Sequence, residues 1–323
     1  MIRFGVIGAG KIAQTFSTAM PHTHGILYAI ASRNLDKALS YQEQYGYEKA
    51  YGSYEAMLSD PLVDCVYIAT PHGLHYEHMM LALDYGKHIL CEKSFTLNAR
   101  QAKDVFDKAK SKHVFVMEAM WTKYLPVIQA TKRLIDQGLI GNLLKMDVSF
   151  GFDAEHRRGS RLFDPAMGGG ALLDIGVYVM TIATYFLGIP QSMDSTVMLD
   201  ASNGFDLSED IHLHYPKAHA HLRCSLSEKL DNICTLTGTQ GTMEIIDFWR
   251  AEHAFIYDLN HQLIQEIHIP HPINGFEYQI QGVIDAITNH QTESTIVTHQ
   301  ATLEIMKLMD QLRASWGLKF PNE

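Results

Sequence analysis

A glycine-rich turn near the start of the chain constrains the fold more than any other feature of this sequence. The run from Gly8 through Gly10, Lys11 and Ile12 to Ala13 follows a short apolar stretch and leads into a helical pattern. It matches GxGxxG with Ala in the last place, a permitted variant. Gly8 makes the tight turn, and Gly10 lets a pyrophosphate approach the backbone at a helix start. This placement predicts dinucleotide binding; the alternative is an ordinary glycine-rich turn.

Four more apolar runs of strand length follow the opening one at residues 2–7. They lie at residues 26–31, 63–69, 88–91 and 114–117, separated by stretches compatible with helices. Strands that alternate with helices are typical of βαβ units, which build a parallel sheet. Residues 1–121 are therefore predicted to form a doubly wound α/β domain of the Rossmann type.

The pattern changes in the second part of the chain. Apolar and polar side chains alternate there, as in residues 145–150 and 210–215, and Gly, Pro and Asn interrupt the segments. Such alternation predicts antiparallel strands with one buried face. Helical patterns at residues 278–289 and 298–316 close the chain. We expect a second α/β domain over residues 122–323, built on a largely antiparallel, open-faced sheet.

Composition argues against several classes of function. The formal net charge of −10 would repel a nucleic-acid backbone. The four cysteines contain no CxxC pair, which favours free thiols in a reducing compartment. The first strand leaves no room for a signal peptide, and no uninterrupted apolar run approaches the ~20 residues of a membrane span. We expect a cytoplasmic protein with neither a nucleic-acid nor a membrane partner.

The residues after the second predicted strand bear on the choice of cofactor. An enzyme that uses NAD places Asp or Glu here, on the ribose hydroxyl, whereas this chain has Ser32 and Arg33. Ser32 can donate to a 2′-phosphate, and Arg33 can pair with that phosphate and stack on the adenine. NADP(H) is the predicted cofactor. NAD(H) stays possible, because Arg33 could instead be a solvated loop charge.

Candidate catalytic residues stand at two further places. Lys93 follows the fourth predicted strand, at the edge of a parallel sheet where ligands bind. A lysine there can stabilise charge on a substrate oxygen, although without further context a surface lysine is the better interpretation. Asp174 and Tyr178 follow three glycines at i and i+4, so they would share one helix face. A carboxylate and a phenol on one face can bind a hydroxyl and exchange its proton.

Five segments together resemble one family of oxidoreductases. GAGKIA, ATPHGLH, GKHILCEKS, MEAMWTKYLP and GGGALLDIGVY have the order and spacing of the glucose–fructose oxidoreductase and inositol dehydrogenase family, Gfo/Idh/MocA. The resemblance covers essentially the whole chain. It favours the branch with dimeric dihydrodiol dehydrogenase and NADP-dependent xylose dehydrogenase, because many relatives have histidine where Tyr178 stands.

The resemblance implies roles for individual residues. Lys93 corresponds to the family's catalytic lysine, Asp174 to its substrate-side aspartate and Tyr178 to the branch's acid–base residue, acting on a CH–OH or C=O carbon. His75, which matches the family's histidine, is the second candidate for the acid. The resemblance also implies a homodimer formed through the C-terminal sheet. The predicted cofactor site consists of Gly8, Gly10, Lys11, Ile12, Ser32, Arg33, Thr70, His72, His75, Glu92, Lys93 and Trp121.

Two positions depart from the family pattern. Ser94 stands where the family usually has a proline, commonly in a cis peptide, and a non-proline cis bond costs ~3–4 kcal/mol. We therefore expect the Lys93–Ser94 peptide to be trans or strained rather than relaxed cis. His72 replaces an asparagine that is frequent in the family.

The expected substrate is small and polar, such as a sugar, a polyol or a dihydrodiol. Trp121, Phe152, Trp249 and Phe276 could wall its pocket, although core packing is at least as good an interpretation of the last three. No metal is expected. The histidine pairs 212/214 and 219/221 could share a strand face, but solvated sheet histidines are the better interpretation. A non-catalytic NADP(H)-sensing regulator, an anhydro-ketose reductase and an inositol dehydrogenase remain as alternative functions.

Overall fold

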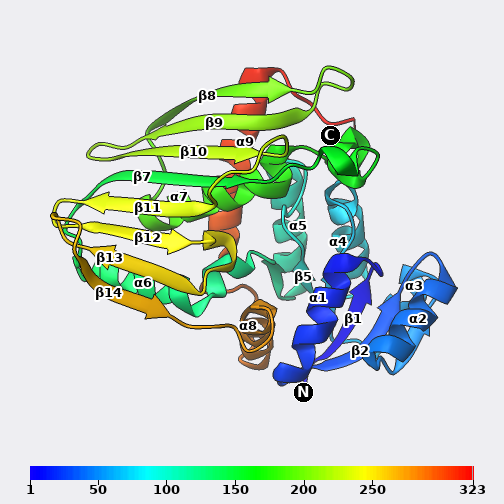
Figure 1. The fold of residues 1–323 in the computed structure, drawn as a ribbon. Coiled ribbons are helices and arrows are strands. Elements are labelled where there is room, and N and C mark those ends of the chain that lie inside the picture. The colour runs from blue at the N-terminus through cyan, green and yellow to red at the C-terminus, as the bar shows by residue number, and fades with distance from the viewer. Residues whose placement is uncertain (322) are drawn as a thin grey trace. The chain divides into compact units, whose positions relative to one another are not determined.

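The computed structural model describes residues 1–321 and 323 (Figure 1). Its packing divides the chain into two compact units. The first unit contains Met1–Trp121 and Pro272–Met306, and the second contains Thr122–His271 and Lys307–Glu323. The sequence analysis assigned residues 272–306 to the second domain. In the structure this segment packs with the first unit, since its helix α8 contacts α1.

The first unit is built on a parallel sheet of six strands in the order β3-β2-β1-β4-β5-β6. The strand order reverses between β1 and β4, the crossover point at which such folds bind ligands. The predicted Rossmann sheet is confirmed, and β3 is an additional edge strand too short to show a pattern. The strands are β1 (Arg3–Ile7), β2 (Ile26–Ala31), β3 (Lys49–Tyr51), β4 (Cys65–Ile68), β5 (His88–Cys91) and β6 (Val116–Glu118).

Local sequence signals define several helices of this unit. The Asn34 side chain caps α2 by accepting from the Lys37 N–H at 3.2 Å, and Asn98 caps α5 by accepting from the Gln101 N–H at 2.9 Å. The helices are α1 (Lys11–Ala19), α2 (Leu35–Tyr45), α3 (Tyr54–Leu58), α4 (His75–Asp84), α5 (Ala99–Lys112), α8 (Phe276–Thr288) and α9 (His299–Trp316), of which α9 continues into the second unit.

The second unit is built on a sheet of eight strands in the order β14-β13-β12-β11-β7-β10-β9-β8. Neighbouring strands are antiparallel except β7 and β10, so the predicted largely antiparallel sheet is confirmed. The strands are β7 (Leu143–Gly151), β8 (Ser192–Leu199), β9 (Asp206–His214), β10 (His219–Ser225), β11 (Ile233–Gly238), β12 (Thr242–Ile246), β13 (His253–Tyr257) and β14 (Leu263–His268).

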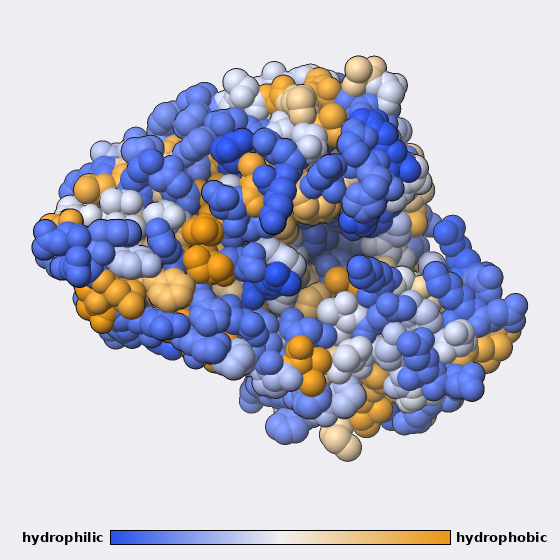
Figure 2. Space-filling model, in the orientation of Figure 1, coloured by the Kyte–Doolittle hydropathy of each residue, from blue (hydrophilic) through white to orange (hydrophobic). Residues whose placement is uncertain are grey.

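Helices cover one face of this sheet. The helix α7 (Val177–Leu187) packs on β7 and β10, and α6 (Pro126–Asp136) packs on β13 (Figure 1). Burial alternates along β9, where Ile211 and Leu213 are buried while Asp210 and His212 are partly exposed. The opposite face of the sheet is therefore the open one, and Figure 2 shows it as mostly hydrophilic.

One segment of the second unit is long and apolar enough to cross a membrane by length and composition. It is Pro165–Leu187, with a mean hydropathy of 1.6, whereas the sequence analysis expected no such segment. Its most apolar window is 83% buried within the protein, and α7 lies in it against the sheet. A helix that is apolar on all sides and buried is a core helix, which accounts for the composition.

Candidate functional site

The predicted glycine turn joins β1 to α1 in the first unit. Gly8 has φ +98°, and a Cβ there would lie 3.0 Å from the carbonyl oxygen of Ala69. Gly10 is the N-cap of α1, with φ −111°, and a Cβ on it would meet nothing within 4 Å. Among the described residues no side chain caps α1. The uncapped first turn and the open side of Gly10 fit a pyrophosphate at a helix N-terminus.

Lys11 and Ile12 continue this turn into α1. Lys11 is exposed and Ile12 is half-buried. The Tyr41 hydroxyl on α2 donates to the carbonyl oxygen of Gly10 at 3.2 Å. This contact fixes the backbone of the turn from the side of α2.

The loop after β2 presents a cation. Ser32 is buried, and its Oγ accepts from the Asn34 N–H at 3.3 Å. Arg33 is exposed; burial raises the pKa of Tyr54, and the nearby positive charge of Arg33 opposes that rise. The end of β2 therefore carries a guanidinium in place of the carboxylate that binds the ribose of NAD.

Two histidines tie the loops after β4 and β5 together. His72 Nε2 lies 3.0 Å from the carbonyl oxygen of Lys93. His75 places Nδ1 at 2.8 Å from the carbonyl oxygen of Ser94 and Nε2 at 2.8 Å from that of Thr70. Because both nitrogens of His75 contact backbone oxygens, this ring holds the loops in place and is a poor candidate for the substrate's acid.

The Lys93–Ser94 peptide is cis, so the trans alternative of the expectation, trans or strained rather than relaxed cis, was wrong. That expectation considered only the intrinsic preference of the bond. In the folded chain both flanking carbonyl groups contact His72 and His75, and the next N–H, of Phe95, donates to Glu118 Oε1 at 3.1 Å. These long-range contacts define the backbone around Lys93, whose side chain is half-buried.

Two more predicted cofactor residues lie in the core of this unit. Glu92 is 5% exposed and accepts a hydrogen bond from the hydroxyl of Tyr67. Trp121 is 5% exposed, and its ring packs against Phe276 with centroids 4.9 Å apart. The two predicted pocket aromatics of the first unit therefore contact each other.

Asp174 and Tyr178 lie on one continuous helical segment of the second unit. Asp174 is in a π-helical turn, η7 (Leu172–Gly176), and Tyr178 is in the first turn of α7. Arg161 Nη2 donates to Asp174 Oδ1 at 2.9 Å, and the Asp174 side chain is only 9% exposed. The nearly buried carboxylate therefore has a cationic partner that the sequence analysis did not identify.

Aromatic rings surround Tyr178. Phe150, at the end of β7, packs edge-on to Tyr178 at 5.5 Å and stacks on Trp249 at 5.2 Å and 12°. Trp249 lies 6.5 Å from Tyr178, and Phe152 lies 6.4 Å from Phe150. The structure thus brings Phe152, Trp249 and Tyr178 together, with Phe150 as the ring between them that was not predicted.

The buried carboxyl group of Asp206 supports the glycines that precede Asp174, and the buried Glu209 interacts with Asp206. Asp206 Oδ2 accepts from the Leu172 N–H at 2.6 Å, and a Cβ on Gly170 would lie 2.4 Å from Asp206 Oδ1. Glu209 accepts a short hydrogen bond from the thiol of Cys224. Burial raises the pKa of both carboxyl groups, and the charge of Asp206 raises that of Glu209 further. The glycine segment therefore packs on Asp206, one of two neighbouring carboxyl groups for which burial favours the neutral form.

The parallel sheet with its crossover point and its uncapped glycine turn defines a dinucleotide-binding Rossmann domain. Residues 2–120 match the family model described as an oxidoreductase family with an NAD-binding Rossmann fold, GFO_IDH_MocA. Residues 128–244 match the GFO/IDH/MocA C-terminal domain. This protein belongs to the GFO/IDH/MocA family of NAD(P)-dependent oxidoreductases, as the five motifs predicted.

Relatives with assigned activities match the chain over its full length. The trans-1,2-dihydrobenzene-1,2-diol dehydrogenase of Mus musculus is 30% identical, with 100% of this chain and 99% of the mouse protein covered. The enzyme of that name from Oryctolagus cuniculus is 31% identical, with 98% and 99% covered.

Solved structures share the fold. A 3-ketoreductase from Actinomadura kijaniata, in complex with NADP and TDP-benzene, has a TM-score of 0.88 and 26% identity, with 97% of each chain covered. Levoglucosan dehydrogenase in complex with NADH has a TM-score of 0.87 at 19% identity, which shows the fold alone; 98% of this chain and 97% of that enzyme are covered. The family model, which describes an NAD-binding Rossmann fold, confirms a nicotinamide dinucleotide as the cofactor.

Proposed function

We propose that this protein is an NADP(H)-dependent dehydrogenase that acts on a CH–OH or C=O carbon of a sugar, polyol or dihydrodiol. The observation that carries the proposal is the placement of Asp174 and Tyr178 on one helical segment, beside the stacked rings of Phe150 and Trp249. A carboxylate and a phenol can hydrogen-bond to two neighbouring hydroxyl groups of a substrate. Aromatic rings can pack against the apolar face of a cyclic substrate. The dihydrodiol dehydrogenases among the relatives support this class.

Each proposed catalytic residue has a distinct role. In reduction Tyr178 donates its phenol proton to the carbonyl oxygen, and in oxidation it accepts the proton back. Lys93 provides an ammonium charge that stabilises the negative charge developing on that oxygen. Asp174, oriented by its ion pair with Arg161, accepts a hydrogen bond from the neighbouring hydroxyl. The nicotinamide, when bound, supplies or accepts the hydride.

The loop after β2 favours NADP(H) over NAD(H) in this proposal. Arg33 would pair with the 2′-phosphate, and Ser32 would donate to it. Gly8, Gly10, Lys11 and Ile12 would hold the pyrophosphate at the start of α1. The remaining predicted cofactor residues, Thr70, His72, His75, Glu92, Lys93 and Trp121, would line the nicotinamide side, where His72 and His75 act by positioning the Lys93 loop.

The test is a substrate screen with a matched variant. The purified chain is assayed at 340 nm with NADPH/NADP⁺ and NADH/NAD⁺ against trans-dihydrodiols, sugars, anhydro-sugars and polyols. On the best substrate, Tyr178→Phe keeps the ring and removes the proton, so turnover should fall by about 10²–10⁴-fold with unchanged cofactor affinity. Near-normal turnover of this variant would remove Tyr178 from the mechanism. No turnover with any substrate would favour a cofactor-sensing regulator.

We also propose that two copies associate through the open face of the eight-stranded sheet and that the protein works in the cytoplasm. The size of that face and the exposed Leu263 and Ile264 on β14 support association. Sedimentation equilibrium should then give twice the 36.4 kDa mass of the chain. A monomer at micromolar concentration would contradict this assembly.

A further inference from the structure

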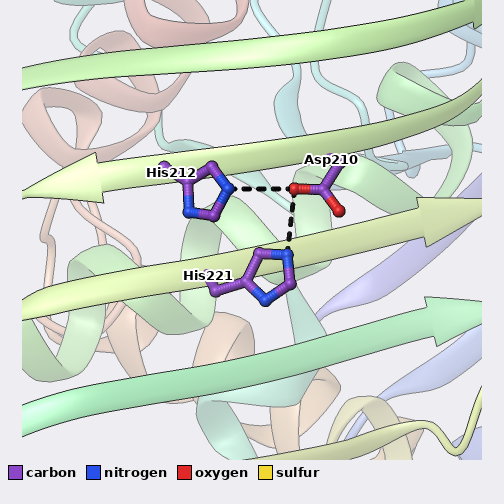
Figure 3. A group of neighbouring side chains, drawn as sticks. All are labelled: Asp210, His212 and His221. Atoms are coloured by element: carbon purple, nitrogen blue, oxygen red, sulfur yellow. Dashed lines mark hydrogen bonds and ion pairs between the residues drawn. The ribbon is translucent and has the colours of Figure 1, made fainter.

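Three potential metal ligands meet on the open face of the eight-stranded sheet (Figure 3). Asp210 and His212 stand on β9 at i and i+2, so both side chains project from one face. His221 on β10 is the direct cross-strand neighbour of His212. In the single chain the side chains of Asp210, His212 and His221 are 39%, 45% and 30% exposed, so dissolved ions can reach them before two copies associate through this face.

The separations of the ligand atoms suit a small divalent cation. His212 Nε2 lies 3.2 Å and His221 Nε2 lies 2.9 Å from Asp210 Oδ1, and all three atoms lie within 4.8 Å of one another. Ligands bound to Zn²⁺ at ~2.0–2.2 Å in a tetrahedron are ~3.3–3.6 Å apart. The two rings are parallel within 8°, with centroids 4.7 Å apart. Rotations of these side chains alone would direct both nitrogens at one ion, because the rings already stand side by side.

The surroundings orient the ligands. Arg223 Nε lies 3.9 Å from Asp210 Oδ2, which leaves Oδ1 for an ion. Asp147 on β7 is the cross-strand neighbour of His221, and its Oδ1 lies 3.8 Å from His221 Nδ1. A carboxylate on the far nitrogen of a ligating histidine fixes the tautomer and raises the basicity of the ring. Asp147 also pairs with Lys145 at 2.7 Å, and Glu228 offsets the positive charge of Arg223 at 3.1 Å.

We propose that Asp210, His212 and His221 bind one Zn²⁺ ion per chain, with water as the fourth ligand. Two imidazoles select zinc over Mg²⁺ and Ca²⁺, which prefer oxygen ligands. The site uses none of the proposed catalytic residues. The sequence analysis grouped the histidines by strand and expected no metal, whereas the strand register joins one histidine from each strand with an aspartate.

The experiment measures zinc binding by the full chain, freed of any polyhistidine tag and stripped of metal. Zn²⁺ is titrated in competition with a chromogenic chelator in the presence of excess Mg²⁺. One ion per chain should bind in the micromolar range. Replacing both histidines, His212→Ala with His221→Ala, should weaken binding by more than the roughly 10–100-fold that loss of a ligand's hydrogen-bond partner costs.

A matched control distinguishes a defined site from nonspecific binding by surface histidines. His214 and His219 form the neighbouring cross-strand pair on the same face. The double variant His214→Ala with His219→Ala should bind zinc like the unaltered chain, and circular dichroism should show both double variants folded. The proposal is overturned by equal losses in the two double variants, by retained affinity without His212 and His221, or by half an ion per chain. Absence of zinc binding by the unaltered chain below millimolar concentration also overturns it.

Discussion

Substitution of Gly10 separates the cofactor role of the glycine turn from its folding role. Gly10 has an extended backbone, φ −111° and ψ 178°, that alanine adopts freely, and a methyl group there meets no protein atom within 4 Å. Gly10→Ala should therefore leave stability unchanged or raise it by about 0.4–1 kcal/mol, through the reduced entropy of the unfolded chain. The added methyl group would occupy the side from which the pyrophosphate approaches. Cofactor binding should weaken at least tenfold, about 1.4 kcal/mol.

Gly8→Ala is the matched substitution, and it should reduce the stability of the fold, which Gly10→Ala should not. At φ +98° an alanine is strained, and its Cβ would lie 3.0 Å from the backbone oxygen of Ala69, which cannot rotate away. The unfolding free energy should fall by about 1–3 kcal/mol. In a protein of this size each kcal/mol lowers the melting temperature by roughly 2–4 °C.

Two measurements on the full chain check this pair. Calorimetric titration with NADPH gives the affinity, and thermal unfolding followed by circular dichroism gives the stability without cofactor. Gly10→Ala should lose affinity while keeping its melting temperature, whereas Gly8→Ala should lose stability. Wild-type NADPH affinity in Gly10→Ala would refute the proposed pyrophosphate position. Equal destabilisation of both variants would refute the separation of roles.

Three further predictions follow from other contacts. Arg33→Ala should weaken NADP(H) binding far more than NAD(H) binding in the same titration, because only NADP(H) carries the 2′-phosphate, and equal losses would contradict this role. Asp60→Asn should cost about 1–3 kcal/mol in urea unfolding at pH 7. Burial favours a higher pKa of Asp60, but hydrogen bonds led by those from Lys49 and Tyr51 hold it well below the usual value, so its contribution is complete above about pH 4 and is lost at lower pH. Glu209→Gln should flatten the loss of stability expected as pH rises above about 4.3, since the folded protein favours the neutral acid; an unchanged pH profile would contradict a protonated Glu209.

The features of the first unit were predictable because short segments of sequence determine them. Gly8 stands at a positive φ directly after β1, and Asn34 caps α2 three residues before the N–H that it binds. Lys93 follows β5 after a single residue, Glu92, and parallel strands bring such positions to one edge of the sheet. The peptide bond after Lys93 was not predictable in this way. Its surroundings include Glu118, His72 and His75, which lie about twenty residues away in the chain.

The second unit was less predictable because tertiary contacts assemble its important groups. Arg161 reaches Asp174 from a loop thirteen residues earlier, and no local pattern marks that arginine among its neighbours. Similarly, Phe150 reads as an ordinary buried strand residue, and only the fold brings it to Trp249 and Tyr178. The strand order also joins His212 to His221 across β9 and β10, a pairing that spacing within one strand does not reveal.

One signal in the sequence of β9 could have indicated the buried acidic pair. Alternate positions of β9 are all buried, namely Leu207, Glu209, Ile211 and Leu213. An acidic residue therefore lies on the otherwise apolar, buried face of this strand. A charged carboxylate is costly there, and its presence indicates a group that stays neutral or has a specific partner. In the structure burial, and after it the charge of Asp206, raises the pKa of Glu209, which favours the neutral form. An acidic residue at a position where the alternation of a strand predicts a buried apolar side chain is thus a sequence signal for a carboxyl group that favours its neutral form. Here it lies beside Asp206, on which the glycines before Asp174 pack.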